Sequence, residues 1–378
     1  MKQTANHLLD SRRIAKKITN DKQPSISCLN SSVSCDRGKH DRVVMPEEQR
    51  EWGVVRELFS SEVDAVIRNE SGTVCYPIRS GICDLRAESA RDLDKKALQS
   101  GRTSSELAVS EEVSTWYDQF GWQPGKSGRY QDSEYFSSNV VSSYGLYESV
   151  SHFDQRKWFH SGKYFLDAAS GAIAHREYLA YSEEHEYRVC VDFSEVALLE
   201  AQRKIGSHGL FVLANVCELP FKDGVFSGVM SGYTVQHIHL DGQAKAIEEL
   251  YRVLGHGHRL CIMTTQIVGK FHQRLFRLIR RLTGSNNSTA RLDGTSDKAP
   301  EPPFPLYGGL RSYDWWLKEC EAICGHVEIH MLRFLSKNEY ESCAISLRAM
   351  TRIRALELWF SKSLARHSDL VSVILSKD

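Results

Sequence analysis

The stretch Lys163-Tyr-Phe-Leu-Asp167-Ala-Ala-Ser-Gly171-Ala-Ile-Ala-His175 decides the fold of this chain. An apolar strand runs through an aspartate into a turn of small residues, and a helical segment is expected to follow. Small residues let backbone N–H groups and a helix N-terminus approach a ligand closely, so the pattern predicts a nucleotide cradle. Taken alone, the same pattern also fits a turn that merely packs a helix on a strand.

A second apolar strand, Tyr187-Arg-Val-Cys-Val-Asp192, ends in an acidic residue about twenty positions beyond the turn. In a doubly wound sheet, this is where a carboxylate that binds ribose hydroxyls belongs. Ser194 is predicted to cap the next helix, in which alanines and an isoleucine recur at helical spacing. The two strands and the returning helix therefore complete a βαβ unit.

Three further apolar strands are predicted at 210–213, 225–231 and 258–264. Before the last of them, a helix capped by Asp241 is predicted, because apolar residues share one of its faces up to Leu254. Strands that alternate with helices in this rhythm indicate a parallel sheet.

Taken in order, these segments resemble the class I S-adenosylmethionine-dependent methyltransferases, in the branch that includes ubiquinone/menaquinone and many natural-product methyltransferases. The resemblance covers about residues 150–265. It implies an α/β fold: a Rossmann-like doubly wound seven-stranded sheet, here with an N-terminal accessory hairpin and a helical cap. It also implies transfer of a methyl group to an O, N or C atom of a small molecule, such as a secondary metabolite or a quinone-like acceptor.

The resemblance implies S-adenosyl-L-methionine as the cofactor. The residues that match its cofactor-binding motifs are Asp167, Ala169, Gly171, Asp192, Phe193, Asn215 and Val216. The chain departs from the family pattern at Ala169, which replaces a glycine, at Asn215 and Ser227, which each replace an aspartate, and at Gly255-His256-Gly257, which replaces a Pro-Gly turn. The methyl group of Ala169 is tolerable if φ is negative there. Asn215 still offers a carbonyl oxygen to an adenine amino group.

A nicotinamide-dependent dehydrogenase is the competing nucleotide-binding interpretation, since both folds place an acid on a ribose. That class needs a G-x-G-x-x-G turn, where glycine lets the backbone approach a pyrophosphate. Here the turn reads Ala169-Ser-Gly171-Ala-Ile-Ala174. Because S-adenosylmethionine has no pyrophosphate, the relaxed turn favours the methyltransferase.

Composition narrows the partners. The 48 basic residues balance the 48 acidic residues, so no global positive field recruits nucleic acid, and a small-molecule acceptor is expected. No apolar run is long enough for a membrane span. The ten cysteines are scattered, several of them in predicted core strands, and this indicates reduced thiols in the cytoplasm. The sequence leaves a homo-oligomer open.

The domain organisation is predicted as follows. The parts are a flexible tail at 1–45, a small accessory domain with a ribbon-like hairpin at 46–110, a helical cap at 111–160, the cofactor-binding core at 161–265, a lid or insertion at 266–310, and a C-terminal helix, hairpin and tail at 311–378. An organellar presequence is the alternative for the tail, although acidic residues weaken it. The second strand of the terminal hairpin is expected at 342–347, and a basic, helical tail from Arg348, with Trp359 and Leu364 packed on the domain or a partner.

The segment Tyr76-Pro-Ile-Arg-Ser-Gly81-Ile-Cys-Asp-Leu85 resembles part of the zinc-ribbon-like domain that some methyltransferases carry or bind as an activator. The upstream C-P-x-C of that domain is missing, and Cys75 and Cys83 lack the spacing of metal ligands. We therefore predict a metal-free hairpin packed on the catalytic domain, with an architectural role, over a zinc site.

Aromatic residues gather between about 112 and 160, and a basic amphipathic helix is predicted at 271–281. Most of the rings are expected to be core residues of a helical cap, and a few could line an apolar substrate pocket. The basic helix would belong to a lid beside the ligand crevice, with a solvated face or contact with a phosphate, lipid or nucleic acid as the alternatives.

Methyl transfer from a sulfonium needs an aligned nucleophile and exclusion of water, and a base helps if the acceptor is a hydroxyl. After the fourth strand, Tyr233 and His237 lie at the carboxyl edge, where the crevice of such sheets lies, and we take both as catalytic candidates. His239 is a weaker candidate. For His237, the alternative is a structural histidine that caps the next helix. A non-catalytic or regulatory S-adenosylmethionine-binding subunit of a larger assembly remains the alternative function.

Overall fold

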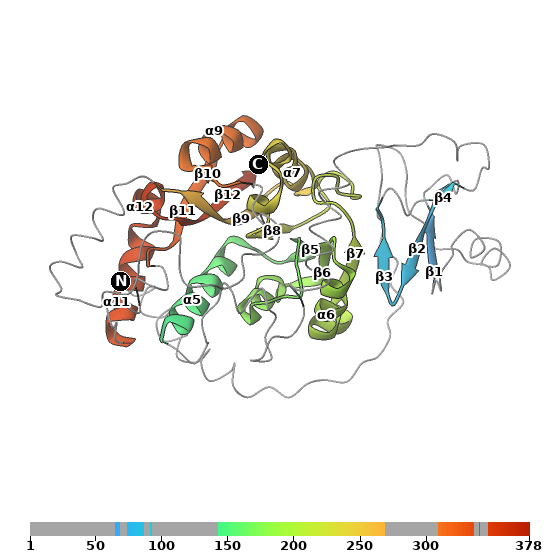
Figure 1. Ribbon diagram of the computed structural model, residues 1–378, viewed down its shortest axis with the longest axis horizontal. Helices are drawn as coiled ribbons and strands as arrows, with labels where there is room; N and C mark the ends of the chain where they lie inside the picture. Colours follow the sequence, from blue (N-terminus) through green and yellow to red (C-terminus); the bar gives the residue numbers. More distant parts are fainter. Residues whose placement is uncertain are drawn as a thin grey trace, which may run out of the picture. The chain divides into compact units, whose positions relative to one another are not determined.

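The computed structural model describes residues 65–68, 74–86, 91–92, 122, 143–268, 309–335, 340 and 347–378. In these residues the main sheet has the strand order β1-β2-β3-β7-β6-β5-β8-β9-β12-β11 (Figure 1). Its seven-stranded part consists of β5 (Gly162–Ala168), β6 (His185–Asp192), β7 (Gly209–Leu213), β8 (Gly228–Gly232), β9 (His258–Ile267), β11 (Val327–Arg333) and β12 (Leu370–Lys377). Only β12 runs antiparallel to its neighbours β9 and β11. This is the doubly wound α/β fold that the sequence predicts.

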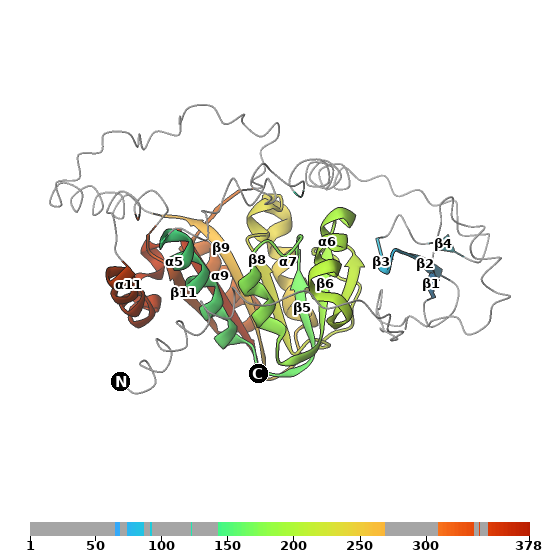
Figure 2. The same cartoon turned by 90° about the horizontal axis from the view of Figure 1, so that it is seen from below.

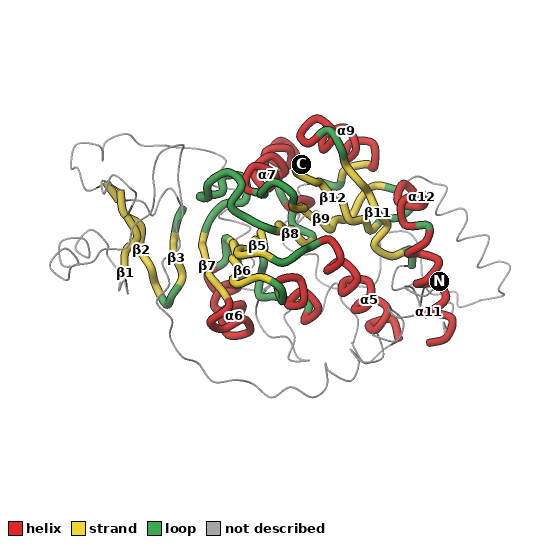
Figure 3. Tube along the Cα trace, turned by 180° about the vertical axis from the view of Figure 1, so that it is seen from behind, coloured by secondary structure: helices red, strands yellow, loops and turns green. Residues whose placement is uncertain are grey.

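The chain order creates a switch point in the middle of the sheet. From β5 the chain moves outward to β6 and β7, and it then returns to the other side of β5 to form β8 and β9. At such a point the connections leave in opposite directions, which opens a crevice at the carboxyl ends of the strands. Figure 3 shows β5, β6 and β8 side by side at this place.

Helices cover both faces of the sheet. α7 (Leu240–Val253) and α9 (Tyr313–Cys324) lie on one side of the strands in Figure 1, and α5 (Ser143–Phe153) and α6 (Glu195–Ile205) lie on the other. The helix α11 (Leu347–Trp359) and the short helices η3 (Asp154–Trp158), η4 (Arg176–Ser182), η5 (Gly206–His208), η6 (Val235–His237), α12 (Ser361–Leu364) and η7 (Ala365–His367) complete the described helical elements. The predicted cap of α6 is confirmed, because the Ser194 hydroxyl accepts from the Ala197 N–H at 3.0 Å. The cap predicted at Asp241 is wrong: α7 begins at Leu240 after His239 without a side-chain cap.

Two apolar layers result from the alternation of side chains along the strands. Leu166 and Val189 pack in the layer beneath α7 and α9, whereas their neighbours Phe165 and Cys190 pack in the layer beneath α6. All four side chains are fully buried. Removing this much apolar surface from water is the main stabilising contribution to the sheet.

The accessory hairpin extends the sheet at its β7 edge. β2 (Val74–Arg79) and β3 (Ile82–Asp84) are joined by Ser80 and Gly81, whose φ angles of 50° and 74° suit a two-residue hairpin turn. β3 pairs in parallel with β7, and β2 also pairs with the short strands β1 (Ala65–Arg68) and β4 (Arg91–Asp92). The prediction of a hairpin packed on the main domain is thus confirmed by strand pairing.

The end of the chain differs from the prediction. The partner of β11 is β12, at Leu370–Lys377, and not a strand at 342–347; residues 341–346 lie outside the described part of the chain. The predicted helix from Arg348 is present as α11, but the tail then becomes a strand between β9 and β11, and Trp359 is 82% exposed. The alternating burial of Val371, Val373 and Leu375 against Ile374 explains why this segment enters the sheet.

Most of the proposed lid at 266–310 and most of the predicted cap at 111–160 lie outside the described residues. The described end of the cap forms α5 and η3, and Figure 2 shows α5 beside β11. β10 (Arg311–Ser312) pairs with the end of β9. Among the described helices, none is both long and apolar enough to cross a membrane.

Candidate active site

The turn after β5 adopts the left-handed conformation at three alternate residues. The φ angles are 55° at Ala169, 53° at Gly171 and 51° at Ile173. The tolerance of Ala169 was predicted on the condition of a negative φ, and the structure does not meet that condition. The left-handed region costs a non-glycine residue on the order of 1–2 kcal/mol. The turn therefore has the backbone conformation that glycine favours, although two of its three left-handed residues are not glycine. The surrounding contacts must offset the energetic cost.

Three contacts hold this turn in place. The Gly171 N–H donates to Asp192 Oδ2 at 2.8 Å, and the Lys204 ammonium donates to the carbonyl oxygens of residues 172 and 173 at 2.6 and 2.9 Å. The ring of Trp122 covers Gly171 so closely that a Cβ there would lie 2.4 Å from it. Trp122, from the predicted aromatic segment, thus packs on the turn. Lys204 was not singled out in the sequence.

Asp192 lies at the carboxyl end of β6, beside the turn. Besides its bond from Gly171, it accepts from the Ser194 N–H through Oδ1 at 2.9 Å. Burial raises the pKa of Asp192 to about 6, although the hydrogen bonds from Ser194 and Gly171 oppose the shift. An ionised carboxylate offers about four acceptor sites, and the N–H groups of Gly171, Ser194 and Phe193 occupy three of them. Asp192 can therefore still accept from a ligand hydroxyl while it holds the turn.

Asp167 lies beneath the turn in a buried ion pair. Arg188 on the adjacent strand donates to Asp167 Oδ2 through Nε at 3.1 Å and also through Nη2. Both side chains are almost fully buried, and Arg188 Nη1 donates to the Tyr178 carbonyl at 2.6 Å. Arg188 was not predicted, although a single arginine inside an apolar strand next to the strand of Asp167 was a visible signal. The main contact of Asp167 is therefore its ion pair with Arg188.

The loop after β7 holds the other two predicted positions. Asn215 Oδ1 accepts from the Cys217 N–H at 2.8 Å, and Val216 is buried. Phe193, after Asp192, is half-buried. From α7, Glu249 accepts from the Leu219 N–H at 2.8 Å, and Arg252 donates to the carbonyl oxygens of residues 219 and 221 at 2.9 and 2.7 Å. The helix thereby fixes the loop beside Asp192.

A second group of polar residues lies at the same edge of the sheet. Tyr233, directly after β8, has a φ of 56°, and its N–H donates to the Met263 carbonyl at 2.7 Å. Its hydroxyl lies 3.0 Å from Nε2 of His152 on α5. Strained backbone of this kind is common at functional sites, where surrounding structure maintains it. Tyr233 is thus held in position against a histidine that sequence analysis did not single out.

His152 is buried, and its Nδ1 has no hydrogen-bond partner among the described residues. Burial lowers the pKa of His152 well below 6.5, and the charges of His175, Arg333 and Arg354 lower it further. Its ring lies 4.7 Å from that of His175, in the turn after β5, and 5.4 Å from that of Tyr178. A neutral imidazole therefore lies next to the glycine turn with one nitrogen unused.

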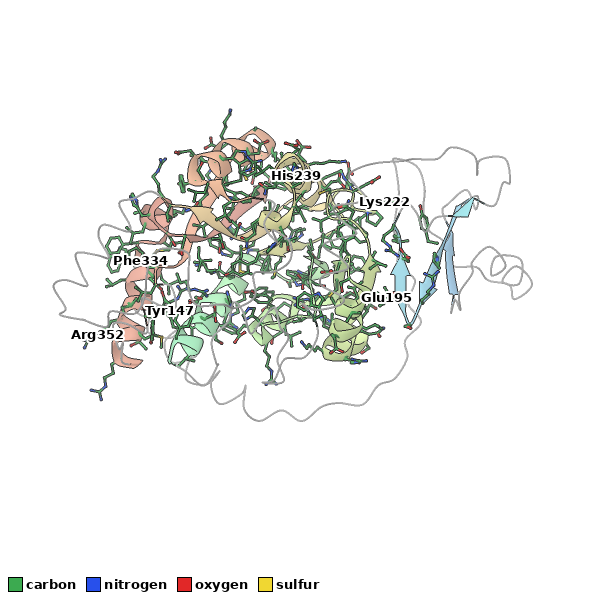
Figure 4. The ribbon with its side chains drawn as sticks, in the orientation of Figure 1. Tyr147, Glu195, Lys222, His239, Phe334 and Arg352 are labelled. Atoms are coloured by element: carbon green, nitrogen blue, oxygen red, sulfur yellow. The ribbon has the colours of Figure 1, made fainter. Side chains whose placement is uncertain are left out.

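The other two histidine candidates lie farther along the loop. His237 ends η6, and its backbone N–H donates to Thr234 at 2.8 Å. His239, labelled in Figure 4, precedes α7 with a side chain that is 65% exposed. Neither caps α7 through its side chain, since the capping position is His239 and carries no such bond. The structure brings Tyr233 together with His152, and the role of His237 stays a prediction.

The hairpin contains a free thiol at Cys83, and burial raises its pKa to about 12. Within the part of the chain that the structure describes, no three histidine, cysteine, aspartate or glutamate residues gather closely enough to hold a metal. The metal-free hairpin stays a prediction for elemental analysis.

This region is similar to known proteins. Residues 166–262 match the family described as "Methyltransferase domain". An uncharacterized protein of Haemophilus influenzae is 30% identical over 109 residues, which are 28% of this chain and 43% of that protein, so the chain spans less than half the length of this relative.

Two solved structures show the range of similar folds. The first is phosphoethanolamine N-methyltransferase 2 of Haemonchus contortus with phosphomonomethylethanolamine and S-adenosylhomocysteine, which is 14% identical with a TM-score of 0.42 over 70% of this chain and 60% of that one. The second is a Haloferax volcanii chain from a complex with the Trm112 methyltransferase activator, at 13% identity and a TM-score of 0.38 over 74% of this chain and 100% of that one. The strand order of the sheet is that of the class I methyltransferase fold, and the match to the methyltransferase family model covers residues 166–262 within it.

Proposed function

We propose that this protein transfers the methyl group of S-adenosyl-L-methionine to a small-molecule acceptor. The observation that carries the proposal is the bond between the Gly171 N–H and Asp192 Oδ2, which joins the turn after β5 to the acidic end of β6 at the switch point. The adenosine would bind across this point, with a ribose hydroxyl donating to Asp192. Asn215, Val216 and Phe193 would contact the adenine, and Ala169 and Gly171 the amino-acid end. Asp167 would support the turn from below.

Methyl transfer needs little covalent chemistry from the protein, because the sulfonium is an activated donor. The acceptor atom must lie in line with the methyl group at roughly 3 Å, in a site that excludes water. As the new bond forms, the sulfur keeps the electron pair of the broken bond, S-adenosylhomocysteine leaves, and a hydroxyl or amine acceptor loses a proton. We propose His152 as the base: its Nε2–H donates to Tyr233, and its unpaired Nδ1 accepts the proton.

We also propose an architectural role for the hairpin. Leu85 is buried in the main core, and its N–H donates to the Leu213 carbonyl at 3.0 Å, immediately before Ala214 and Asn215. The parallel pairing of β3 therefore fixes the strand that leads into the adenine-side loop. This is the kind of support that the resemblance to an activator domain implies.

The expected pH dependence of cofactor binding follows from Asp192. Its pKa of about 6 means that it is ionised at pH 7.5 and largely protonated at pH 5, where one acceptor site becomes a donor. The affinity for S-adenosylmethionine should therefore be about 10-fold lower at pH 5 than at pH 7.5, measured by calorimetry. Asp192→Asn should remove this dependence, and Asp192→Ala should cost roughly 1–3 kcal/mol of binding. Unchanged affinity in the alanine variant would remove Asp192 from the site.

Asn215→Asp is expected to keep or improve cofactor affinity. An aspartate would restore the acceptor of the family pattern, and its Oδ1 could still accept from the Cys217 N–H. The same calorimetric titration measures the change. A large loss of affinity would mean that Asn215 uses its amide N–H groups on the adenine.

Turnover separates the enzyme from the alternative of a regulatory subunit. A methyltransferase releases S-adenosylhomocysteine when candidate acceptors are added to the purified protein with S-adenosylmethionine. Tight cofactor binding without release, across hydroxyl, amine and carbon acceptors, would favour the non-catalytic function.

A further inference from the structure

We propose that the methyl acceptor carries an anionic group, a carboxylate or a phosphate, which binds the guanidinium of Arg333. This inference rests on the proposed function, because it names the substrate class of the same site. Arg333 ends β11, which runs parallel to β9, so its side chain starts from the same edge of the sheet as Tyr233 and the turn after β5.

Arg333 differs from the other buried arginines in its hydrogen bonds. Arg188 uses Nε, Nη1 and Nη2, and Arg354 uses the same three atoms with Asp154, Glu357 and the carbonyl of residue 332. Arg333 binds Glu148 through Nη2 at 2.9 Å, while its Nε and Nη1 have no partner among the described residues. Leaving a buried donor unsatisfied costs about 1–3 kcal/mol, and more on a charged group. Acceptor oxygens are therefore expected at Arg333.

One face of α5 lines this place. Tyr144, Glu148 and His152 are spaced four residues apart, so they lie on the same side of the helix. The Arg333 guanidinium lies 5.8 Å from the centre of the Tyr144 ring and is paired with Glu148. In Figure 4, Tyr147 marks α5 and Phe334 marks the residue after Arg333; the Phe334 N–H lies 3.2 Å from the Tyr147 hydroxyl. The contacts fix α5 against the end of β11.

Other unused polar atoms belong to the same neighbourhood. Besides Arg333, the His152 Nδ1 and the Tyr178 hydroxyl are buried without a partner in the described structure, and their rings lie 5.4 Å apart. Tyr233 belongs to the same group, because its hydroxyl lies 3.0 Å from His152 Nε2. Burial raises the pKa of its phenol, and the positive charge of Arg333 opposes this rise. An acceptor with an anionic end on Arg333 and a nucleophilic atom near His152 would satisfy these groups together. A charged oxygen is favoured over a neutral one, because hydrogen bonds between ions are roughly twice as strong.

Anion titration of the full chain tests this proposal. The Nε–H resonance of Arg333, in protein with ¹⁵N-labelled arginine, is assigned by its loss in Arg333→Lys. Inorganic phosphate and acetate are then titrated against it at constant ionic strength with chloride. We expect saturable shifts of the resonance with at least one of the two anions. A shift with phosphate only indicates a phosphate on the acceptor, and a shift with acetate only indicates a carboxylate. Thermal-shift titrations give the affinity for that anion from the rise in melting temperature. This affinity should be at least about 10-fold lower in Arg333→Lys than in wild type.

The matched control is Arg366→Lys, because Arg366 is exposed and pairs with Asp314 on the surface. It should titrate like wild type. An Arg333 resonance that neither anion moves, or anion binding that is equal in Arg333→Lys and wild type, overturns the proposal. The titration is made without cofactor and again with S-adenosylhomocysteine. Failure to bind S-adenosylhomocysteine would thus count against the proposed function separately from the anion site.

Discussion

Replacing Arg188 with methionine is expected to lower the free energy of unfolding by about 3–5 kcal/mol. The substitution leaves Asp167 as a buried charge without its partner, beneath the turn that carries Gly171. It also removes the donors to the Tyr178 carbonyl and the Ser182 hydroxyl. Urea denaturation followed by circular dichroism measures the loss, with the midpoint falling at unchanged slope.

The control for this prediction is the double variant Asp167→Asn/Arg188→Met. Because the unpaired charge is then gone, it should recover part of the lost stability, as buried ion pairs exchanged for neutral groups often do. Arg203→Met should change stability by less than about 1 kcal/mol, since Arg203 pairs with Glu200 on the surface. A loss below about 1 kcal/mol in Arg188→Met would show that Asp167 is not an uncompensated charge there.

Replacing His152 with glutamine is expected to lower kcat by about 10²-fold or more, with cofactor affinity near wild type. A base acts in the transition state, and glutamine can still bond the Tyr233 hydroxyl without accepting a proton. Because the pKa of His152 lies well below 6.5, the imidazole is neutral at pH 7. Its titration should therefore lower kcat/KM only at pH values well below 6.5, and the profile should show no step near 6.5 from this group.

His237→Gln is the matched comparison, since it tests the base that the sequence favoured. If His152 is the base, His237→Gln should lose little turnover per folded molecule and change the melting temperature only slightly. Turnover is normalised to the folded fraction because His152 is buried. The opposite pattern, a large loss of kcat in His237→Gln alone, would return the assignment to His237. Intact turnover in both variants would leave catalysis to positioning of the acceptor.

Local patterns were enough to predict the core of the fold. Apolar runs that end in Asp167 and Asp192, small residues between them and helical spacing after Ser194 are short-range signals, and a parallel sheet with a switch point follows from their order. The hairpin at Ser80-Gly81 was equally local, because its turn chemistry and flanking strands lie within ten residues. The place of Asp192 beside Gly171 followed from the same rules.

The final strand shows where local patterns stop. Residues 370–377 are an apolar run whose pairing partners, β9 and β11, lie far away in the sequence, and a basic helix precedes them. Pairing between distant segments depends on which edge of the sheet is open after the other strands have formed. That cannot be read from the segment itself.

The sequence by itself determined the α/β class, the parallel strands that alternate with helices and the acidic residue at the end of β6. Tertiary structure alone decided that Arg188 pairs with Asp167, that Ala169 and Ile173 take left-handed angles, and that His152 meets Tyr233. These contacts join residues from different elements across the sheet, and their geometry depends on how α5, β8 and β11 pack. Periodicity reports only which face of each element is buried, so it cannot show which polar atoms meet there or which remain without a partner.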